Sequence, residues 1–219
     1  MEKQTLILEH NYRAPIINSP NPPAIIMLHG FGSDENDLFS FSSELPNEYA
    51  IISLKAPIRL EPYGNAWYNI YYDHPQGKFS DDEQAIASRD LVARCIDEIV
   101  SMYKVDSQRI TLIGFSQGTI LSFAVALSYP EKVKNVIGLS GYINKDILVS
   151  DYTEKNHSNL HIYTSHGTQD QVIPIDWARQ SKPFLEQLNI DCTYSEFPVG
   201  HGVAPENFME LKNWLQNHP

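Results

Sequence analysis

The chain has 219 residues, of which 42% are hydrophobic and 20% charged, a composition typical of a globular protein with one sizeable core. We therefore expect residues 1–219 to form a single α/β domain. The formal charge of −11 argues against nucleic acid and anionic membrane surfaces as partners, because both would repel the protein. No apolar run approaches the roughly 20 residues of a membrane span, so stable membrane insertion is not expected.

The first ten residues lack a basic segment followed by a long apolar segment, which predicts a cytoplasmic protein without a secretory signal. Cys95 and Cys192 are isolated from each other and form no C-x-x-C pair, a pattern that suits a reducing compartment. Both are expected to be small core residues. The sequence leaves the oligomeric state open, with a homodimer as one option.

Taken in chain order, residues 4–18 alternate loosely between apolar and polar side chains, which favours an antiparallel hairpin at a sheet edge. The proline-rich residues 19–23 cannot continue it. Continuous apolar runs predict buried strands at Ala24–Leu28 and Ala50–Leu54. Between them, Asn36–Phe41 has the pattern of a short helix.

Residues 61–77 show no clear periodicity and are rich in tyrosine, which predicts a long functional loop. Its aromatic side chains could line an acyl pocket, and Trp67 and Ile70 are the candidates, together with Val172 further along the chain. The alternative is a loop held against the body of the protein by aromatic burial.

Ser80–Glu83 has the form of a capping box, and the apolar residues that follow at three- and four-residue intervals predict a long amphipathic helix. The second half then alternates predicted strands and helices: strand 110–113, helix 120–127, strand 133–139, strand 160–165, helix 176–188, strand 192–197 and a closing helix after Pro205. Such alternation predicts a mostly parallel sheet with helices on both faces and an active site beyond the carboxyl ends of the strands.

The segment Ile110–Thr119 joins an apolar strand directly to a helix through Gly-Phe-Ser-Gln-Gly. This is the pattern of a nucleophile elbow, in which a strained serine is held at the strand end and the flanking glycines let strand and helix approach closely. The alternative is a glycine-rich turn with a structural serine. The elbow interpretation makes Ser116 the nucleophile.

A serine hydroxyl needs a general base and an acid that orients the base. His201 lies between two glycines after a predicted strand, and Asp170 lies in a loop after another. The chain order Ser116, Asp170, His201 is the order expected of α/β-hydrolases. The backbone N–H groups of Phe31 and Gln117 are the candidate donors to the oxyanion.

These candidates have rivals. His29 and His166 also follow predicted strands, but both precede the candidate acid in the chain. For the acid, the alternatives are Asp146, Asp151, Asp176 and Glu196. A metal site at His166 and Asp170 lacks a third ligand at a recognisable spacing, so no metal is expected.

Five segments in this order resemble the phospholipase/carboxylesterase family of α/β-hydrolases, which includes the acyl-protein thioesterases: Leu28–Leu38, Ala66–Tyr68, Gly114–Gly118, His166–Pro174 and Gly200–Gly202. The resemblance runs from about residue 24 to the end. It implies an α/β-hydrolase fold with no large lid, Ser116, Asp170 and His201 as catalytic triad, the amides of Phe31 and Gln117 as oxyanion hole, and no cofactor. Phe31 departs from the leucine that eukaryotic thioesterases often carry, and residues 63–72 are unusually rich in tyrosine.

The leading hypothesis is a serine carboxylesterase for small-molecule esters with short to medium acyl chains. The second is an acyl-protein thioesterase or lysophospholipase that acts on longer chains at the same site. The third is a non-catalytic binding protein built on a hydrolase fold.

Overall fold

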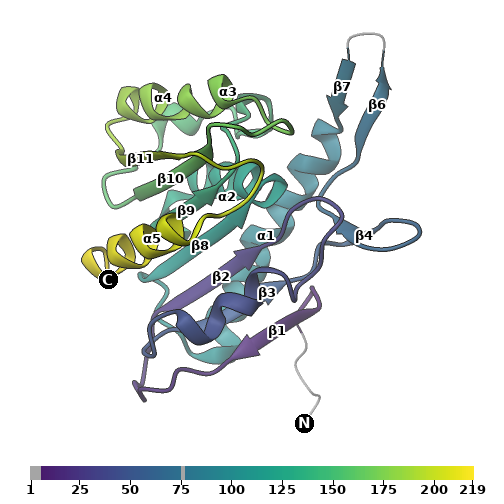
Figure 1. The fold of residues 1–219 in the computed structure, drawn as a ribbon. Helices are drawn as coiled ribbons and strands as arrows, with labels where there is room; N and C mark the ends of the chain where they lie inside the picture. The colour runs from purple at the N-terminus through teal and green to yellow at the C-terminus, as the bar shows by residue number, and fades with distance from the viewer. Residues whose placement is uncertain (1–5, 75–76) are drawn as a thin grey trace.

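A seven-stranded sheet lies at the centre of the computed structural model, which describes residues 6–74 and 77–219 (Figure 1). The strands, in their order across the sheet, are β1 (His10–Arg13), β3 (Ala50–Leu54), β2 (Ala24–Leu28), β8 (Ile110–Phe115), β9 (Asn135–Leu139), β10 (His161–Gly167) and β11 (Asp191–Phe197). Only β1 runs antiparallel to its neighbour, so the predicted mostly parallel sheet is confirmed.

The inner strands β2, β3 and β9 are mostly apolar because both faces of the sheet are covered there. Every residue of β2, β3 and β9 is buried. Side chains alternate between two hydrophobic clusters: Ile26 packs in the cluster that includes the central helices, whereas Ile25 and Met27 pack in the cluster on the other face. Continuous apolar runs are the usual signature of such doubly covered parallel strands.

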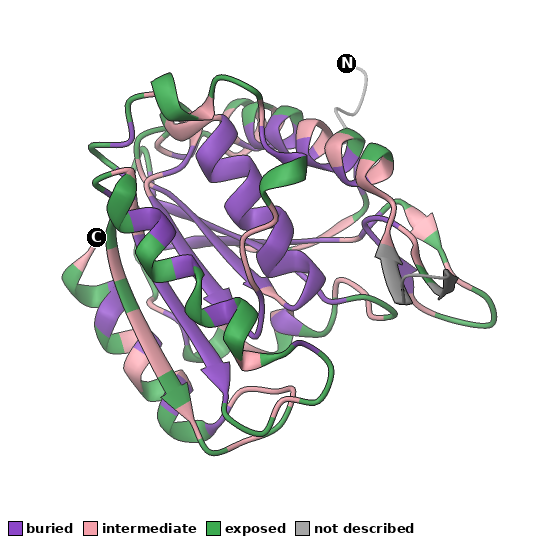
Figure 2. Ribbon diagram, turned by 90° about the horizontal axis from the view of Figure 1, so that it is seen from above, coloured by how far each residue is buried: buried purple, intermediate pink, exposed green. Residues whose placement is uncertain are grey.

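Helices cover both faces, as the sequence predicts. One face carries α1 (Asp82–Tyr103), α2 (Gln117–Ser128) and α4 (Ser181–Gln187), and the other carries the 3-10 helix η1 (Leu38–Glu44) and α5 (Pro205–Asn217). All residues of α2 are buried, and Figure 2 shows this helix among the buried strands. The short helices are η2 (Pro130–Lys132), η3 (Lys145–Ile147), η4 (Tyr152–Glu154) and α3 (Ile175–Arg179).

The predicted N-terminal hairpin is wrong. Within residues 6–18, the structure contains one strand, β1, which pairs with β3 at the sheet edge. The Arg13 guanidinium donates to four backbone carbonyl groups around η1, and Tyr12 stacks on Tyr103 of α1 at 4.1 Å. These long-range contacts hold the segment against the body of the protein, and Pro15 could not supply a ladder donor to a second strand.

The long irregular loop predicted at residues 61–77 is also wrong. The segment contains β5 (Asn65–Ala66), which pairs with β4 (Ile58–Arg59), and the hairpin β6 (Ile70–His74) and β7 (Gly77–Ser80), which projects from the body in Figure 1. The register of the hairpin shifts between Tyr71 and His74, which breaks the alternation that would have revealed a strand. Residues 75 and 76 lie outside the described residues.

Three helix boundaries differ from the prediction. The cap of α1 is Asp81 rather than Ser80, and its carboxylate accepts from the N–H of Gln84 at 3.0 Å. The helix expected at residues 36–41 is the 3-10 helix η1, which begins at Leu38. The helix expected at residues 176–188 is interrupted at Gln180, because Pro183 has no N–H for a bond to the preceding turn.

The described residues contain no large lid domain, as the sequence predicts. In the same residues, no helix combines the length and the apolar character that crossing a membrane requires.

The packing of α2 against β2 makes Gly118 a sharp test of the fold. A Cβ atom at this position would lie 1.9 Å from the carbonyl oxygen of Leu28, so Gly118→Ala requires the helix and the strand to separate. We expect a loss of unfolding free energy on the order of 3–5 kcal/mol. Urea denaturation measures it, with Gly202→Ala as the matched control because a Cβ there meets no atom within 4 Å. Equal unfolding midpoints for the two variants would contradict this account of the packing.

Candidate active site

Ser116 lies between β8 and α2 in a backbone conformation that non-glycine residues rarely adopt, with φ 54° and ψ −115°. Close packing on both sides holds it there. A Cβ at Gly114 would lie 2.5 Å from the carbonyl oxygen of Gly118, and one at Gly118 would strike Leu28. The predicted strand, tight bend and helix are therefore present, and the strain directs the Ser116 hydroxyl out at the strand end.

Hydrogen bonds fix the bend to the neighbouring strand β9. The Ser116 N–H donates to the carbonyl oxygen of Leu139 at 2.8 Å, and the Leu139 N–H donates to the hydroxyl of Thr119 at 2.9 Å. The same hydroxyl lies 2.8 Å from the carbonyl oxygen of Gly114. Strand, bend and helix are thus joined by common hydrogen-bond partners. The backbone of Ser116 cannot return to an unstrained conformation without breaking these buried hydrogen bonds.

The structure brings Ser116, Asp170 and His201 into one hydrogen-bonded row, called the Ser116 row below. The Ser116 Oγ lies 2.9 Å from Nε2 of His201, and Nδ1 of His201 lies 2.7 Å from Oδ2 of Asp170. Asp170 follows the carboxyl end of β10, and His201 follows that of β11. Parallel strands end at the same edge of the sheet, which explains why residues so far apart in the chain meet.

The surroundings of Asp170 favour the ionised form of its carboxyl group. Its side chain is completely buried, which by itself raises the pKa of the carboxyl group. The hydrogen bonds from His201 and from the N–H groups of Ile173 (2.9 Å) and Val172 (2.8 Å) outweigh this effect, so the pKa lies below its ordinary value. An ionised Asp170 holds the proton of His201 on Nδ1, which leaves the Nε2 lone pair facing the serine hydroxyl.

The rival histidines hold backbone groups near the strand ends. His29 is fully buried, its Nδ1 donates to the carbonyl oxygen of Gly30 at 2.8 Å, and its Nε2 accepts from the N–H of Ala56 at 3.1 Å. Burial lowers the pKa of His29 and keeps the ring neutral. His166 donates from Nε2 to the carbonyl oxygen of Ile173 at 2.9 Å, and the same nitrogen lies 3.3 Å from Oδ2 of Asp170. Both rings hold loops at the strand ends in place.

Two of the rival acids are also engaged at a distance from His201. Asp176 and Glu196 both pair with the guanidinium of Arg179, at 3.3 and 2.7 Å. The carboxylate that contacts His201 belongs to Asp170, in agreement with the ranking from chain order.

The loop after β2 lies against the bend. A Cβ at Gly30 would be 3.1 Å from the ring of Phe115 and 3.4 Å from the Cβ of Ser116, which places the backbone of the next residue, Phe31, beside the serine. Among the turn and loop hydrogen bonds of the described residues, neither the N–H of Phe31 nor that of Gln117 is a donor. Both groups are therefore free to bind an oxyanion.

The role of the Gln117 side chain is not predicted by the sequence pattern. Its carbonyl oxygen accepts from the N–H of Trp67 at 2.8 Å, and its amide nitrogen donates to the carbonyl oxygen of Tyr68 at 2.7 Å. The residue next to Ser116 thus holds a segment almost fifty positions away. A glutamine within a buried helix was the available signal, since a buried carboxamide needs both a donor and an acceptor as partners.

The expectation that Trp67 lines a substrate pocket is wrong. Its side chain is fully buried and its indole N–H donates to the carbonyl oxygen of His29 at 3.0 Å, so the ring fills the core beneath the loop. Of the other pocket candidates, Ile70 is half-buried and packs against the same core, whereas Val172 is exposed and lies beside Asp170.

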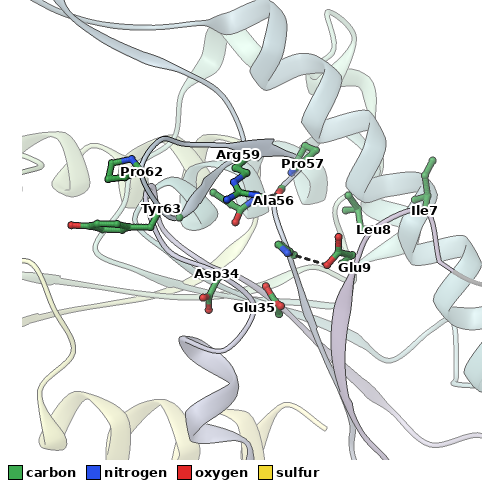
Figure 3. A pocket seen from close by; sticks show the side chains of 13 residues that line it. Ile7, Leu8, Glu9, Asp34, Glu35, Ala56, Pro57, Arg59, Pro62 and Tyr63 are labelled. Carbon is green, nitrogen blue, oxygen red and sulfur yellow. Dashed lines mark hydrogen bonds and ion pairs between the residues drawn. The ribbon is translucent and has the colours of Figure 1, made fainter.

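A cavity of about 670 Å³ lies beside the Gly64 turn and is strongly polar (Figure 3). Charged side chains surround it, including Asp34, Glu35 and the ion pair of Lys55 with Glu9 at 2.9 Å. Among the described residues, neither this cavity nor those of about 600, 540 and 480 Å³ is lined by a member of the Ser116 row.

Comparisons with known proteins agree with this geometry. The family model for phospholipases and carboxylesterases matches residues 14–219. A probable carboxylesterase of Oryza sativa is 26% identical over 70% of this chain, and the match spans 58% of that relative's length. Acyl-protein thioesterase 1 of Yarrowia lipolytica is 30% identical over 70% of this chain and 68% of its own. The carboxylesterase of Bacillus cereus shares the fold, with a TM-score of 0.83, 19% identity and coverage of 97% and 95% of the two chains.

Gln117→Ala tests the link between α2 and residues 67–68. The change keeps the backbone N–H of residue 117 but leaves the buried N–H of Trp67 and the carbonyl oxygen of Tyr68 without their partners. We expect a loss of unfolding free energy of about 2–4 kcal/mol, measured by urea denaturation. Gln108→Ala, at an exposed position, is the control. An unchanged unfolding midpoint for Gln117→Ala would show that the carboxamide does not hold the segment.

Proposed function

Because the chain belongs to the phospholipase/carboxylesterase family, we propose that it is a serine hydrolase of carboxylic esters, with Ser116 as nucleophile, His201 as general base and Asp170 as the acid that orients it. The observation that carries the proposal is the pair of contacts at His201, 2.9 Å to the Ser116 hydroxyl and 2.7 Å to the Asp170 carboxylate. This geometry lets the serine lose its proton as it attacks.

The reaction proceeds through an acyl-enzyme. Oγ of Ser116 attacks the carbonyl carbon of the ester while its proton moves to Nε2 of His201, and the tetrahedral intermediate collapses as the alcohol leaves with that proton. Water then attacks the acyl group and gives a proton to His201. The carboxylic acid leaves as this proton returns to Ser116, so the enzyme regains its starting state.

The N–H groups of Phe31 and Gln117 stabilise the oxyanion of both tetrahedral intermediates. Each such donor contributes on the order of 2.7–4 kcal/mol of transition-state stabilisation. Phe31 belongs to the loop after β2, and Gln117 to the first turn of α2, so the two donors come from different segments of the chain.

The substrates we propose are small-molecule esters with short to medium acyl chains. The main support is that, among the described residues, no member of the Ser116 row lines any of the four cavities described above. A serine that opens into none of these cavities has little room beside it to bury a long acyl chain. The net charge of −11 further favours a neutral substrate over an anionic polymer such as nucleic acid.

Ser116→Ala removes the proposed nucleophile, so we expect kcat for a chromogenic short-chain ester to fall on the order of 10⁶-fold. In the wild type, a fluorophosphonate should label this serine, and peptide mass spectrometry locates the label. Ser107→Ala, at an exposed position, should keep full turnover and labelling. Turnover that persists in Ser116→Ala, or a label on another residue, would overturn the assignment.

A second candidate is a thioesterase or lysophospholipase acting on longer acyl chains, and one cavity favours it. A space of about 600 Å³ is lined by Tyr142, Ile143, Trp177 and Phe184, with Tyr142 and Trp177 in edge-to-face contact at 5.0 Å. Tyr142 follows Gly141, which packs against the backbone of Ser116. A long chain leaving the serine could lie in this groove, where aromatic side chains would bind its methylene groups.

A series of p-nitrophenyl esters from acetate to laurate separates the two candidates. We expect kcat/KM to be highest at short to medium chains, with Trp177→Ala changing it less than twofold at every length. For a long-chain enzyme, kcat/KM would instead be highest for octanoate or longer esters. In that case Trp177→Ala would lower kcat/KM on the order of tenfold for the long esters and leave the short ones unchanged. Met209→Ala, an exposed apolar residue on α5, is the control for nonspecific loss of apolar surface.

A further inference from the structure

A second group of functional side chains lies at the opposite edge of the sheet. His161 begins β10, Asp191 begins β11, and His218 directly follows α5. One ligand atom from each, an imidazole nitrogen or a carboxylate oxygen, lies within 4.8 Å of the other two. Nothing in the chemistry at Ser116 requires this cluster.

The fold brings these residues together by three constraints. The parallel register places His161 directly opposite Asp191. The carbonyl oxygen of His218 accepts from the side-chain amide of Asn135 at 2.7 Å, which fixes the end of α5 beside the start of β9. The ring of His218 also stacks on Trp214 at 4.1 Å, so its orientation is restricted.

Both imidazoles present a nitrogen toward Asp191. His218 donates from Nδ1 to the carbonyl oxygen of Trp214 at 2.8 Å, which leaves the lone pair on Nε2 free, 3.9 Å from Oδ2 of Asp191. Nδ1 of His161 is buried without a hydrogen-bond partner and lies 3.7 Å from the same oxygen. A backbone carbonyl that fixes the tautomer of a ligating histidine is the usual arrangement around protein-bound metals.

We propose that His161, Asp191 and His218 bind a divalent transition-metal ion, with Zn²⁺ as the best match. Two imidazoles and one carboxylate suit zinc, whereas calcium and magnesium prefer oxygen ligands alone. Bond lengths near 2.0–2.2 Å in a tetrahedral site put the ligand atoms roughly 3.3–3.5 Å apart, so the distances to Asp191 need to shorten by a few tenths of an ångström. Asp191 is exposed and can rotate to close them. The two imidazole nitrogens lie within 4.8 Å of each other, so binding also requires the rings to adjust toward a common ion.

The ion would act on stability rather than on the reaction. β10 and β11 also lead to Asp170 and His201, but those residues follow the carboxyl ends of the strands. Seven residues of strand at about 3.3 Å each separate the two edges by roughly 20 Å, too far for the metal to touch an ester at Ser116. Binding ties the start of two strands to the end of α5 and leaves the catalytic edge free.

The competing explanation is a purely ionic cluster in which Asp191 attracts protonated imidazoles. Other charged side chains lie near this edge: Glu131, Lys134 and Lys155 line the same cavity as His161, and the ammonium group of Lys134 donates to the carbonyl oxygen of Pro219. A cation there opposes metal binding but also opposes protonation of the two rings. Metal titration distinguishes the two explanations, because an ionic cluster binds no Zn²⁺.

The test begins with EDTA-treated, dialysed protein titrated with ZnCl₂ by calorimetry and with CoCl₂ by visible absorption. We expect one equivalent to bind, with the intense bands of tetrahedral Co²⁺. Thermal unfolding at a free Zn²⁺ concentration of 100 Kd should shift upward on the order of 5–10 °C. Turnover of a short-chain ester should change less than twofold between the metal-free and the zinc-loaded protein.

The variants Asp191→Asn and His218→Gln should lose the Co²⁺ bands and the thermal shift. Both should fold and keep wild-type ester turnover, because neither residue approaches Ser116. His10→Gln, which alters a histidine outside the cluster, should bind Zn²⁺ like the wild type. Failure of the wild type to bind, or equal binding by Asp191→Asn and the wild type, would overturn the proposal. Binding that survives in Asp191→Asn but is lost in His201→Ala would assign the ion to the Ser116 row instead.

Discussion

The close approach of α2 to β2 at Gly118 is the constraint on which the rest of the site depends. The backbone of Gly118 lies so near the carbonyl oxygen of Leu28 that no side chain fits between them. This contact prevents α2 from sliding back along its axis, and Ser116 must therefore complete the bend in its left-handed conformation. The strain at Ser116 is thus maintained by this packing together with the hydrogen bonds that fix the bend to β9.

Much of the fold could be predicted because the decisive signals are local. Doubly covered parallel strands such as Ala24–Leu28 and Ala50–Leu54 leave continuous apolar runs, and these were found with their full bounds. The positions of Asp170 and His201 after β10 and β11 followed from the same pattern, because parallel strands end at one edge. Sequence could place the three side chains at this edge, but their mutual distances required the structure.

The failures occurred where tertiary contacts decide the outcome. Trp67 looked like a pocket residue because it is aromatic and lies in an irregular stretch, yet its indole and backbone groups all find buried partners. The hairpin β6–β7 was missed because a register shift interrupts its alternation. The N-terminal segment became one edge strand because Arg13 binds carbonyl groups more than thirty residues away. None of these contacts leaves a local trace in the sequence.

The same buried contacts couple the two proposed oxyanion donors. The carboxamide of Gln117 holds the backbone of Trp67, the indole of Trp67 holds the carbonyl oxygen of His29, and His29 precedes the loop that carries Phe31. His29 is in turn fixed to Ala56 after β3. A displacement of either donor would therefore break hydrogen bonds that link it to the other. The spacing of the two N–H groups is set by this chain of buried polar contacts, which explains why residues of catalytic type, such as His29, serve here to position the backbone.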